Sequence, residues 1–425
     1  MRNKRILGVD MRVKIDSVIK WIVILAIASA LSLFKPLGVI ASIFYFEYAV
    51  RWSMVLLAMV TCVLLIYKKK IENKYLIFIS CFVVCLVLTR LFLDLIAGRN
   101  VYKELNANST YFFILFAFPV YYLLKYRIIT LNKLLDMIIF LTTLSYFLRL
   151  YISAYYSFFH QRIFYPISIE SASEKWFRNG VLRINPPCFG LIIIALCLYQ
   201  FYSAKKLRRR IYYGMVIVLS VYYSAFIHYS RAVLIYQISE LIFLIYIKRK
   251  RALKQVMLNL FLGSVGVILL INGYFDKLLD LFSIQNAEYW FSNTSRMIAY
   301  PYYFGVFLNN IWMGIGLLLG DELYFASNNV TGALSDVGAL RSLVQLGAGM
   351  FIFYASFFIN GFMTGAKLQI KGNDQNLVIL VWGITISVFL TCINIDCFFP
   401  VYVFSVPFCM AIIEYIRVID GMIYR

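Results

Sequence analysis

The chain has 425 residues, of which 62% are hydrophobic and only 14% are charged. A soluble domain of this length cannot bury so much apolar surface, so the composition excludes a soluble protein and indicates an integral membrane protein. The formal net charge of +21 does not indicate a nucleic-acid partner, because the basic residues form short runs that alternate with pairs of apolar stretches.

Apolar stretches recur along the whole chain. At roughly 30 to 35 residues for each span and its loop, the length allows about twelve transmembrane helices. The expected spans are 17–34, 48–67, 75–97, 109–124, 134–152, 187–202, 211–227, 233–247, 256–271, 340–359, 377–393 and 398–416. We therefore expect an all-α fold in which residues 1–425 form a single polytopic membrane domain.

The basic runs predict the orientation of these spans. They lie at 2–20, 68–74, 125–133, 205–210, 248–254 and 367–371. Loops rich in Lys and Arg stay in the cytoplasm, so both termini are expected there and the remaining connections face outward. Two outward connections are long, a medium loop at 160–186 and a large loop at 272–339. Within the large loop, 290–308 has the pattern of amphipathic helices.

The chain has few side chains that are suited to binding a metal or to redox chemistry. The only histidines are His160 and His228, and the eight cysteines lie in or beside apolar runs. We expect no metal site and no cofactor.

Some ionisable residues fall inside predicted spans, where charge is costly. Arg90 and Asp94 are four residues apart on one helical face and are expected to pair. Arg149 lies near the outer end of its span and is expected to reach the membrane surface. Glu240 lies in mid-span with no apparent partner, which leaves an ion or proton relay open.

A set of arginines lies on or near the predicted outer surface. Its members are Arg178, Arg183, Arg231, Arg296 and Arg341. The planar guanidinium binds phosphate oxygens through two hydrogen bonds, and its charge does not depend on pH. Several converging arginines would suit a pyrophosphate, whereas isolated ones would anchor to lipid headgroups. Pro186 and Pro187 are expected to open the span that follows, since proline is tolerated in a first helical turn.

Four segments of this region resemble motifs of the O-antigen polymerase and O-antigen ligase superfamily. They are Arg183-x-Asn185-Pro186-x-x-x-Gly190, then Ser230-Arg231-Ala232-Val233-Leu234, then Ser295-Arg296 with Trp312-Met313-Gly314-Ile315-Gly316, and finally Ser335-Asp336-Val337-Gly338 with Gly347-Ala348-Gly349. The similarity covers roughly residues 178–354. Ligases of the superfamily usually carry a histidine where this chain has Asp336, so the resemblance favours the O-antigen polymerase family.

This resemblance implies a GT-C-like glycosyltransferase of the bacterial inner membrane, working at the periplasmic face on undecaprenyl-pyrophosphate-linked oligosaccharides. A chain-length regulator and a flippase of the same pathway are the implied protein partners. It implies that Asp336 is the catalytic base and that the five arginines and Asn185 bind pyrophosphate or sugar. Asp336 could instead cap a helix that begins near Gly338, since aspartate is favoured at such positions.

Three other functions are compatible with parts of the sequence. A flippase for lipid-linked oligosaccharides would share the spans and the basic cytoplasmic face, and an O-antigen ligase would share the motifs. An ion-coupled transporter would use Asp94 and Glu240. The long loop at 272–339 argues against the flippase. A flippase also needs charged residues along a central cavity, whereas these arginines are expected to gather at one surface.

Overall fold

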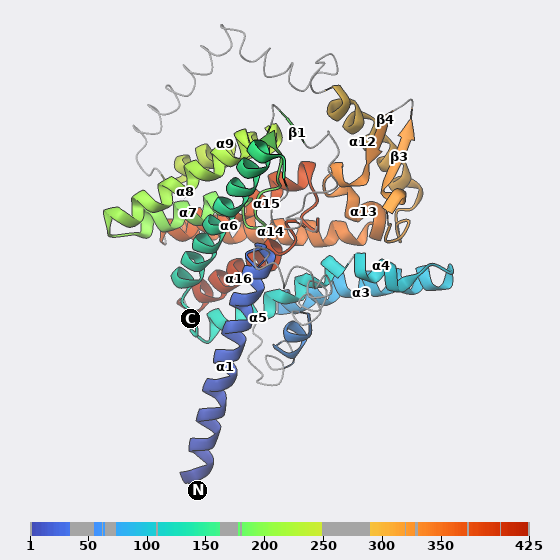
Figure 1. The fold of residues 1–425 in the computed structure, drawn as a ribbon. Coiled ribbons are helices and arrows are strands. Elements are labelled where there is room, and N and C mark those ends of the chain that lie inside the picture. The colour runs from blue at the N-terminus through green and yellow to red at the C-terminus, as the bar shows by residue number, and fades with distance from the viewer. Residues whose placement is uncertain are drawn as a thin grey trace.

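The computed structural model describes residues 2–34, 55–61, 63, 74–107, 109–161, 177–178, 181–248, 290–318, 320–327, 330–371, 374–399 and 401–423, and most of them are helical (Figure 1). The first half contains α1 (Arg2–Ala30), α3 (Lys74–Ile96), α4 (Val101–Ala107), η1 (Ser109–Phe116), α5 (Ala117–Lys125), α6 (Leu131–Phe159), β1 (Phe177–Arg178), β2 (Val181–Leu182) and α7 (Ile193–Ser203). The second half contains α8 (Leu207–Phe226), α9 (Arg231–Lys248), α12 (Trp290–Asn309), η3 (Gly320–Leu323), β3 (Tyr324–Ser327), β4 (Val330–Ala333), η4 (Leu334–Asp336), α13 (Leu340–Leu346), α14 (Gly349–Ile370), α15 (Gln375–Asn394) and α16 (Ser405–Ile423).

Four of the described helices are long and apolar enough to cross a membrane. They are Tyr75–Ile96, Leu131–Phe159, Gly349–Ile370 and Gln375–Asn394. These apolar helices indicate a protein embedded in a membrane. Three of them agree with predicted spans, at 75–97, 134–152 and 377–393, whereas Gly349–Ile370 overlaps only the second half of the span predicted at 340–359. The full number of spans and the position of the termini stay predictions.

The outward faces of the helices carry large apolar side chains, as expected for a surface in contact with lipid. On α8 these exposed side chains recur every three or four residues and are Leu207, Ile211, Met215, Val218, Tyr222 and Phe226. This spacing places them on one stripe of the helix. Exposing such a stripe to water is unfavourable, so we assign it to the hydrocarbon of a bilayer.

The largest apolar core of the described residues is built around α15. That helix packs against α14 on one side and against α7 and α9 on another, while α16 packs against α5. Residues 193–200 of α7 are all buried, so this short helix lies inside the protein rather than against lipid. The core extends through α5, α6 and α16.

Several predicted spans differ from the observed helices. The span predicted at 340–359 is two helices, α13 and α14, separated at Gly347, where φ is +80°. Turns occupy 188–192 and 401–404, so α7 begins at Ile193 and α16 at Ser405. The prolines at 186 and 187 therefore do not open a helix. The predicted span at 256–271 and most of the one at 48–67 lie outside the described residues.

The outer loops contain short strands that the sequence analysis did not predict. β1 pairs with β2 in the medium loop, and β3 pairs with β4 in the large loop, both antiparallel. The large loop also contains α12, which confirms a helix within 290–308. The all-α prediction thus holds for the membrane helices, and the loops add two hairpins.

Connections predicted to share a side of the membrane contact one another. On the inner side, the Tyr122 hydroxyl donates to Asp16 at 2.8 Å and Lys248 Nζ donates to Asn376 at 2.5 Å. On the outer side, the Ala339 amide donates to the Cys392 carbonyl at 2.8 Å. Figure 1 places α12, α13, β3 and β4 at one end of the helical bundle and the turn between α7 and α8 at the other. We call these the outer and the inner end.

Candidate active site

The segment from Leu182 to Asn185 is held at the outer end through its carbonyl oxygens. Ser153 donates to the Leu182 carbonyl at 2.9 Å, and Tyr223 donates to the Ile184 carbonyl at 3.1 Å. Arg149 Nε donates to the Asn185 carbonyl at 3.1 Å. Since each donor comes from α6 or α8, two packed helices fix the backbone that carries Arg183.

Arg149 differs from the sequence prediction. It is buried, and besides Asn185 it donates to the carbonyl of Leu31 at 3.2 Å and to the hydroxyl of Ser145. The guanidinium therefore joins α6 to the end of α1 and to the outer loop, and does not extend to the membrane surface. A lone arginine in an apolar run was the only signal of this role in the sequence.

Arg183 connects two of the sequence motifs. Its Nε donates to the carbonyl of His228 at 3.0 Å. His228 lies in the turn between α8 and α9, where the Ser230 hydroxyl accepts from the Val233 amide at 3.5 Å and so caps α9. Arg231 is the first residue of α9. The segment of Arg183 and the segment of Arg231 thus meet at the outer end, as their predicted topology requires.

Arg296 lies on α12, which packs against the segment that contains Asp336. Ala299 and Tyr303 of this helix belong to a small apolar core that also includes Leu334 and Val337. This core fixes α12 against η4 and α13. Arg296 is partly buried, and among the described residues its Nε has no hydrogen-bond partner.

Asp336 is positioned by a close approach between its segment and the end of α15. Gly338 has a φ of +58°, and its backbone pairs in parallel with Ile395. A Cβ atom at residue 338 would lie 2.3 Å from the Cys392 carbonyl oxygen, so only glycine fits. The N-cap of α13 is Ala339, without a side-chain cap bond. Asp336 therefore does not cap this helix, which removes the structural alternative considered for it.

Two arginines act electrostatically on Asp336. Burial raises the pKa of its carboxyl group, and the positive charges of Arg296 and Arg183 oppose that rise. Tyr300 of α12 interacts with both Arg296 and Asp336, and burial raises the pKa of its phenol. Its hydroxyl donates to the carbonyl of Ile393 at the end of α15. We call Arg183, Arg296 and Asp336 the open cluster, because Arg296 retains an unused buried donor.

Arg341 belongs to a different group. It is buried in α13, its Cζ lies 5.3 Å from the centre of the Phe399 ring, and it interacts electrostatically with Asp396. Asp396 is fully buried, accepts from the Tyr354 hydroxyl at 2.7 Å and also accepts from the Ser342 hydroxyl. Burial raises the pKa of Asp396, while the charge of Arg341 lowers it. The sequence analysis missed Asp396, although an acid within an apolar stretch was a signal.

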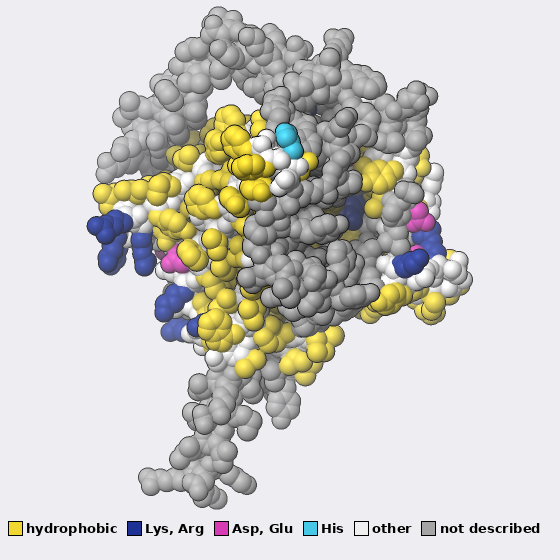
Figure 2. Space-filling view, in the orientation of Figure 1, with side chains coloured by type: hydrophobic (Ala, Val, Ile, Leu, Met, Phe, Trp, Pro, Cys, Tyr) yellow, Lys and Arg dark blue, Asp and Glu magenta, His cyan; other side chains and the backbone are white. Residues whose placement is uncertain are grey.

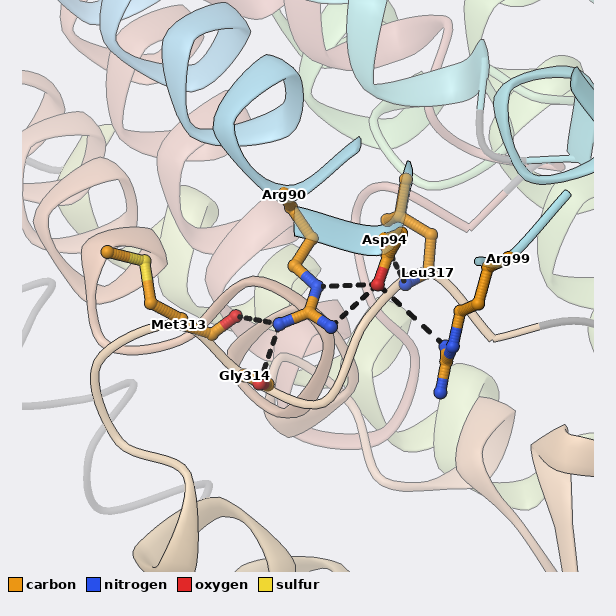
Figure 3. Close-up of polar contacts among 6 residues, drawn as sticks. All are labelled: Arg90, Asp94, Arg99, Met313, Gly314 and Leu317. Atoms are coloured by element: carbon orange, nitrogen blue, oxygen red, sulfur yellow. Dashed lines mark hydrogen bonds and ion pairs between the residues drawn. The ribbon is translucent and has the colours of Figure 1, made fainter. Parts of the chain in front are cut away.

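A second charge cluster at the outer end contains Arg90, whose side-chain nitrogens all donate hydrogen bonds, and Arg99, whose buried Nη1 has no hydrogen-bond partner among the described residues. Arg90 Nη2 lies 2.6 Å from Asp94 Oδ1, and Nε donates to the same oxygen at 3.1 Å, which confirms the predicted ion pair. Arg90 Nη1 donates to the carbonyls of Met313 and Gly314 at 3.2 and 3.1 Å (Figure 3). The Leu317 amide approaches the other carboxylate oxygen at 3.5 Å. This pair fastens the glycine-containing segment of the large loop to α3.

Gly316 makes room for that contact. Its φ is +113°, and a Cβ atom there would lie within 3.0 Å of atoms from Arg90, Asp94 and Arg99. Arg99 Nη1 lies 4.0 Å from Asp94 Oδ1, so two cations share one buried carboxylate (Figure 3). We call Arg90, Asp94 and Arg99 the closed cluster. The glycines of this motif therefore serve packing.

The structure gives less detail for the remaining predicted residues. Arg178 lies in β1 opposite Val181, and the orientation of its side chain lies outside the description. The side chain of Asn185 is partly buried. Glu240 is buried in α9, and its Oε1 has no hydrogen-bond partner within the described ranges. Across those same ranges, no three side chains of His, Cys, Asp or Glu gather as a metal site.

No protein-family model matches the chain, and neither does any curated protein. The motif resemblance therefore stands without support from a relative, and the site itself has to carry the functional argument.

Proposed function

We propose that this chain is a membrane glycosyltransferase that polymerises undecaprenyl-pyrophosphate-linked repeat units into O-antigen or a similar surface polysaccharide. It acts at the periplasmic face of the bacterial inner membrane, with about twelve spans, a GT-C-like fold and both termini in the cytoplasm. The observation that carries the proposal is the open cluster, in which two arginines act electrostatically on a partly buried carboxylate at the outer end.

The charges of the open cluster fit the needs of this reaction. Two guanidinium groups and one carboxylate leave a net positive site, which suits a pyrophosphate. Arg296 has a donor that no described group uses, and an anionic ligand would satisfy it. An exposed headgroup anchor would not require this burial, so the geometry favours a substrate site over simple lipid anchoring.

In the proposed mechanism Asp336 accepts the proton from a sugar hydroxyl of the acceptor. That oxygen forms a bond to the anomeric carbon of the donor, while the bond from this carbon to the pyrophosphate oxygen breaks. The departing electron pair stays on the pyrophosphate, where Arg183 and Arg296 stabilise the charge. The raised pKa of Asp336 makes it a stronger base than an ordinary aspartate, provided that the pH keeps it ionised.

The other groups at the outer end have supporting roles. Arg341 and Asp396 hold the start of α13 against the end of α15, and the closed cluster holds the large loop on α3. Arg178, Asn185 and Arg231 remain candidates for binding the sugar or the pyrophosphate. The expected partners are the bilayer, the lipid-linked oligosaccharides, and a chain-length regulator and flippase of the same pathway.

The surface polysaccharide of a strain that lacks the protein tests this proposal. Separated on a gel, a polymerase defect gives lipid carrying a single repeat unit. The ligase alternative predicts that no unit is attached to the final acceptor, and the flippase alternative predicts that no unit is exported. A normal ladder would contradict the polymerase proposal.

A further inference from the structure

A pocket at the inner end lies between α6 and α8, far from the open cluster along both helices. Its volume is about 310 Å³, and it is lined by Asp136, Phe140, Arg208, Arg209, Tyr212 and Tyr213. Figure 2 shows Lys and Arg side chains gathered at the end of α7 and α8, beside a broad hydrophobic surface. The pocket thus joins a charged edge to an apolar face.

Hydrogen bonds fix the walls of the pocket. The Tyr213 hydroxyl donates to Asp136 at 2.5 Å, and the Tyr212 hydroxyl donates to Thr143 at 3.4 Å. These bonds tie α8 to α6 and occupy the carboxylate. Arg208 and Arg209 stay exposed, so the pocket presents two cations against one hydrogen-bonded acid.

The start of α8 lacks the negative charge that a helix N-terminus favours. The unpaired amides of a first turn carry a partial positive charge, and acidic residues there are stabilising. This first turn has no acid, and it contains Arg208 and Arg209 instead. A bound anion would relieve the repulsion among these like charges.

Exposed apolar side chains continue beyond the pocket along both helices. They are Phe140, Leu144 and Phe147 on α6 with Ile211, Met215 and Val218 on α8, and we call them the apolar strip. The spacing on both helices keeps these side chains on the outer face of the bundle. An acyl chain can therefore lie beside them while its headgroup occupies the pocket.

We propose that this pocket binds the phosphodiester headgroup of an anionic phospholipid, with Arg208 and Arg209 contacting the phosphate and an acyl chain lying against the apolar strip. Two exposed cations beside lipid-facing apolar side chains suit this ligand better than a soluble one. The site does not depend on the reaction at the outer end.

Lipid binding to the full-length protein tests the proposal. The protein is purified in detergent and titrated with phosphatidylglycerol or phosphatidylcholine, and bound lipid is counted by native mass spectrometry. We expect selective retention of phosphatidylglycerol by the wild type. The double variant Arg208→Gln with Arg209→Gln should bind it roughly 20-fold more weakly, since each basic residue near a membrane contributes about fivefold.

The matched control is Lys205→Gln with Lys206→Gln, which removes the same charge from the same basic run but outside the pocket lining. We expect a change of less than about threefold for this control. An equal loss in both double variants would overturn the proposal in favour of general surface charge. Equal retention of the two lipids by the wild type would also overturn it, without requiring any variant to fold.

Inorganic phosphate provides a further arm of the experiment. If phosphate displaces phosphatidylglycerol at equal concentration, the pocket binds a free anion and the apolar strip contributes nothing, which would overturn the proposal. We expect displacement only at a large excess of phosphate, because burial of the acyl chain adds to the affinity of the lipid.

Discussion

The open and the closed cluster contain the same residue types at the same end of the molecule, yet they are built differently. In the closed cluster Arg90 donates to Asp94 and to two backbone carbonyls. In the open cluster Asp336 interacts with two arginines, and Arg296 keeps a buried donor that no described group uses. A guanidinium whose donors are all used, such as that of Arg90, holds chain segments together, whereas one with an unused buried donor, such as that of Arg296, has capacity for a ligand. We therefore expect substitutions in the open cluster to lower turnover and substitutions in the closed cluster to lower stability.

The largest expected effect is that of Asp336→Asn on turnover. The amide keeps the size of the side chain but cannot accept the proton, so polymer formation should fall by about 10²- to 10⁴-fold. Protein abundance should not change, because Asp336 caps no helix. The polysaccharide ladder in cells and the rate with lipid-linked donor measure this. Glu322→Gln, at an exposed acid of the same loop, is the control and should keep the ladder.

Removing the cations of the open cluster should come next in size. Arg296→Ala and Arg183→Ala should each lower turnover by about 10²- to 10³-fold, since each removes a contact to the departing pyrophosphate. Lysine should restore little, because it keeps the charge and loses the planar fork. Arg99→Ala is the matched control, as it removes an arginine from the closed cluster at the same end. Full activity of both open-cluster variants at normal abundance would make these residues lipid anchors.

The closed cluster should respond in stability. Asp94→Ala leaves Arg90 without its carboxylate and should lower the free energy of unfolding by about 3–5 kcal/mol, the usual cost of breaking a buried pair. The unfolding temperature in detergent and the yield of folded protein measure this effect. Turnover per folded molecule should stay close to that of the wild type. A stable Asp94→Ala protein with no activity would place the closed cluster in the chemistry.

A smaller effect concerns pH. Asp336 must be ionised to act as a base, so turnover should fall as the pH drops through its pKa, which burial raises above the usual value of 3.8. Arg296 opposes that rise, so Arg296→Gln should move the acid limb of the residual activity to higher pH. Rate against pH for the two proteins gives the comparison. Coincident acid limbs would separate Arg296 from Asp336.

The sequence predicted local features well. The spacing of Arg90 and Asp94 predicted their ion pair, and the apolar stretch at 377–393 predicted α15. The alternation of basic loops also predicted that Arg183, Arg296 and Asp336 lie on the same side of the membrane. These features depend on residues close together in the chain or on the alternation of loops, both of which leave a pattern in the sequence.

Long-range contacts left no such pattern. Arg149 donates hydrogen bonds to carbonyls more than thirty residues away in the chain. Asp396 accepts hydrogen bonds from side chains of α13 and α14. The break at Gly347 depends on the backbone of 311–312, against which the end of α13 packs. Helical period alone gave one span there, because the residues on both sides of the break are apolar.

Binding of undecaprenyl pyrophosphate to the purified protein is the sharpest test of a pyrophosphate site in the open cluster. The wild type and Asp336→Asn should both bind it, because neither lacks the arginines. The double variant Arg183→Gln with Arg296→Gln should bind it more weakly by on the order of 100-fold, since it loses two charge-assisted contacts. Arg99→Gln should bind it as the wild type does. Unchanged affinity in the double variant, in a protein that unfolds at the wild-type temperature, would show that Arg183 and Arg296 do not bind the pyrophosphate.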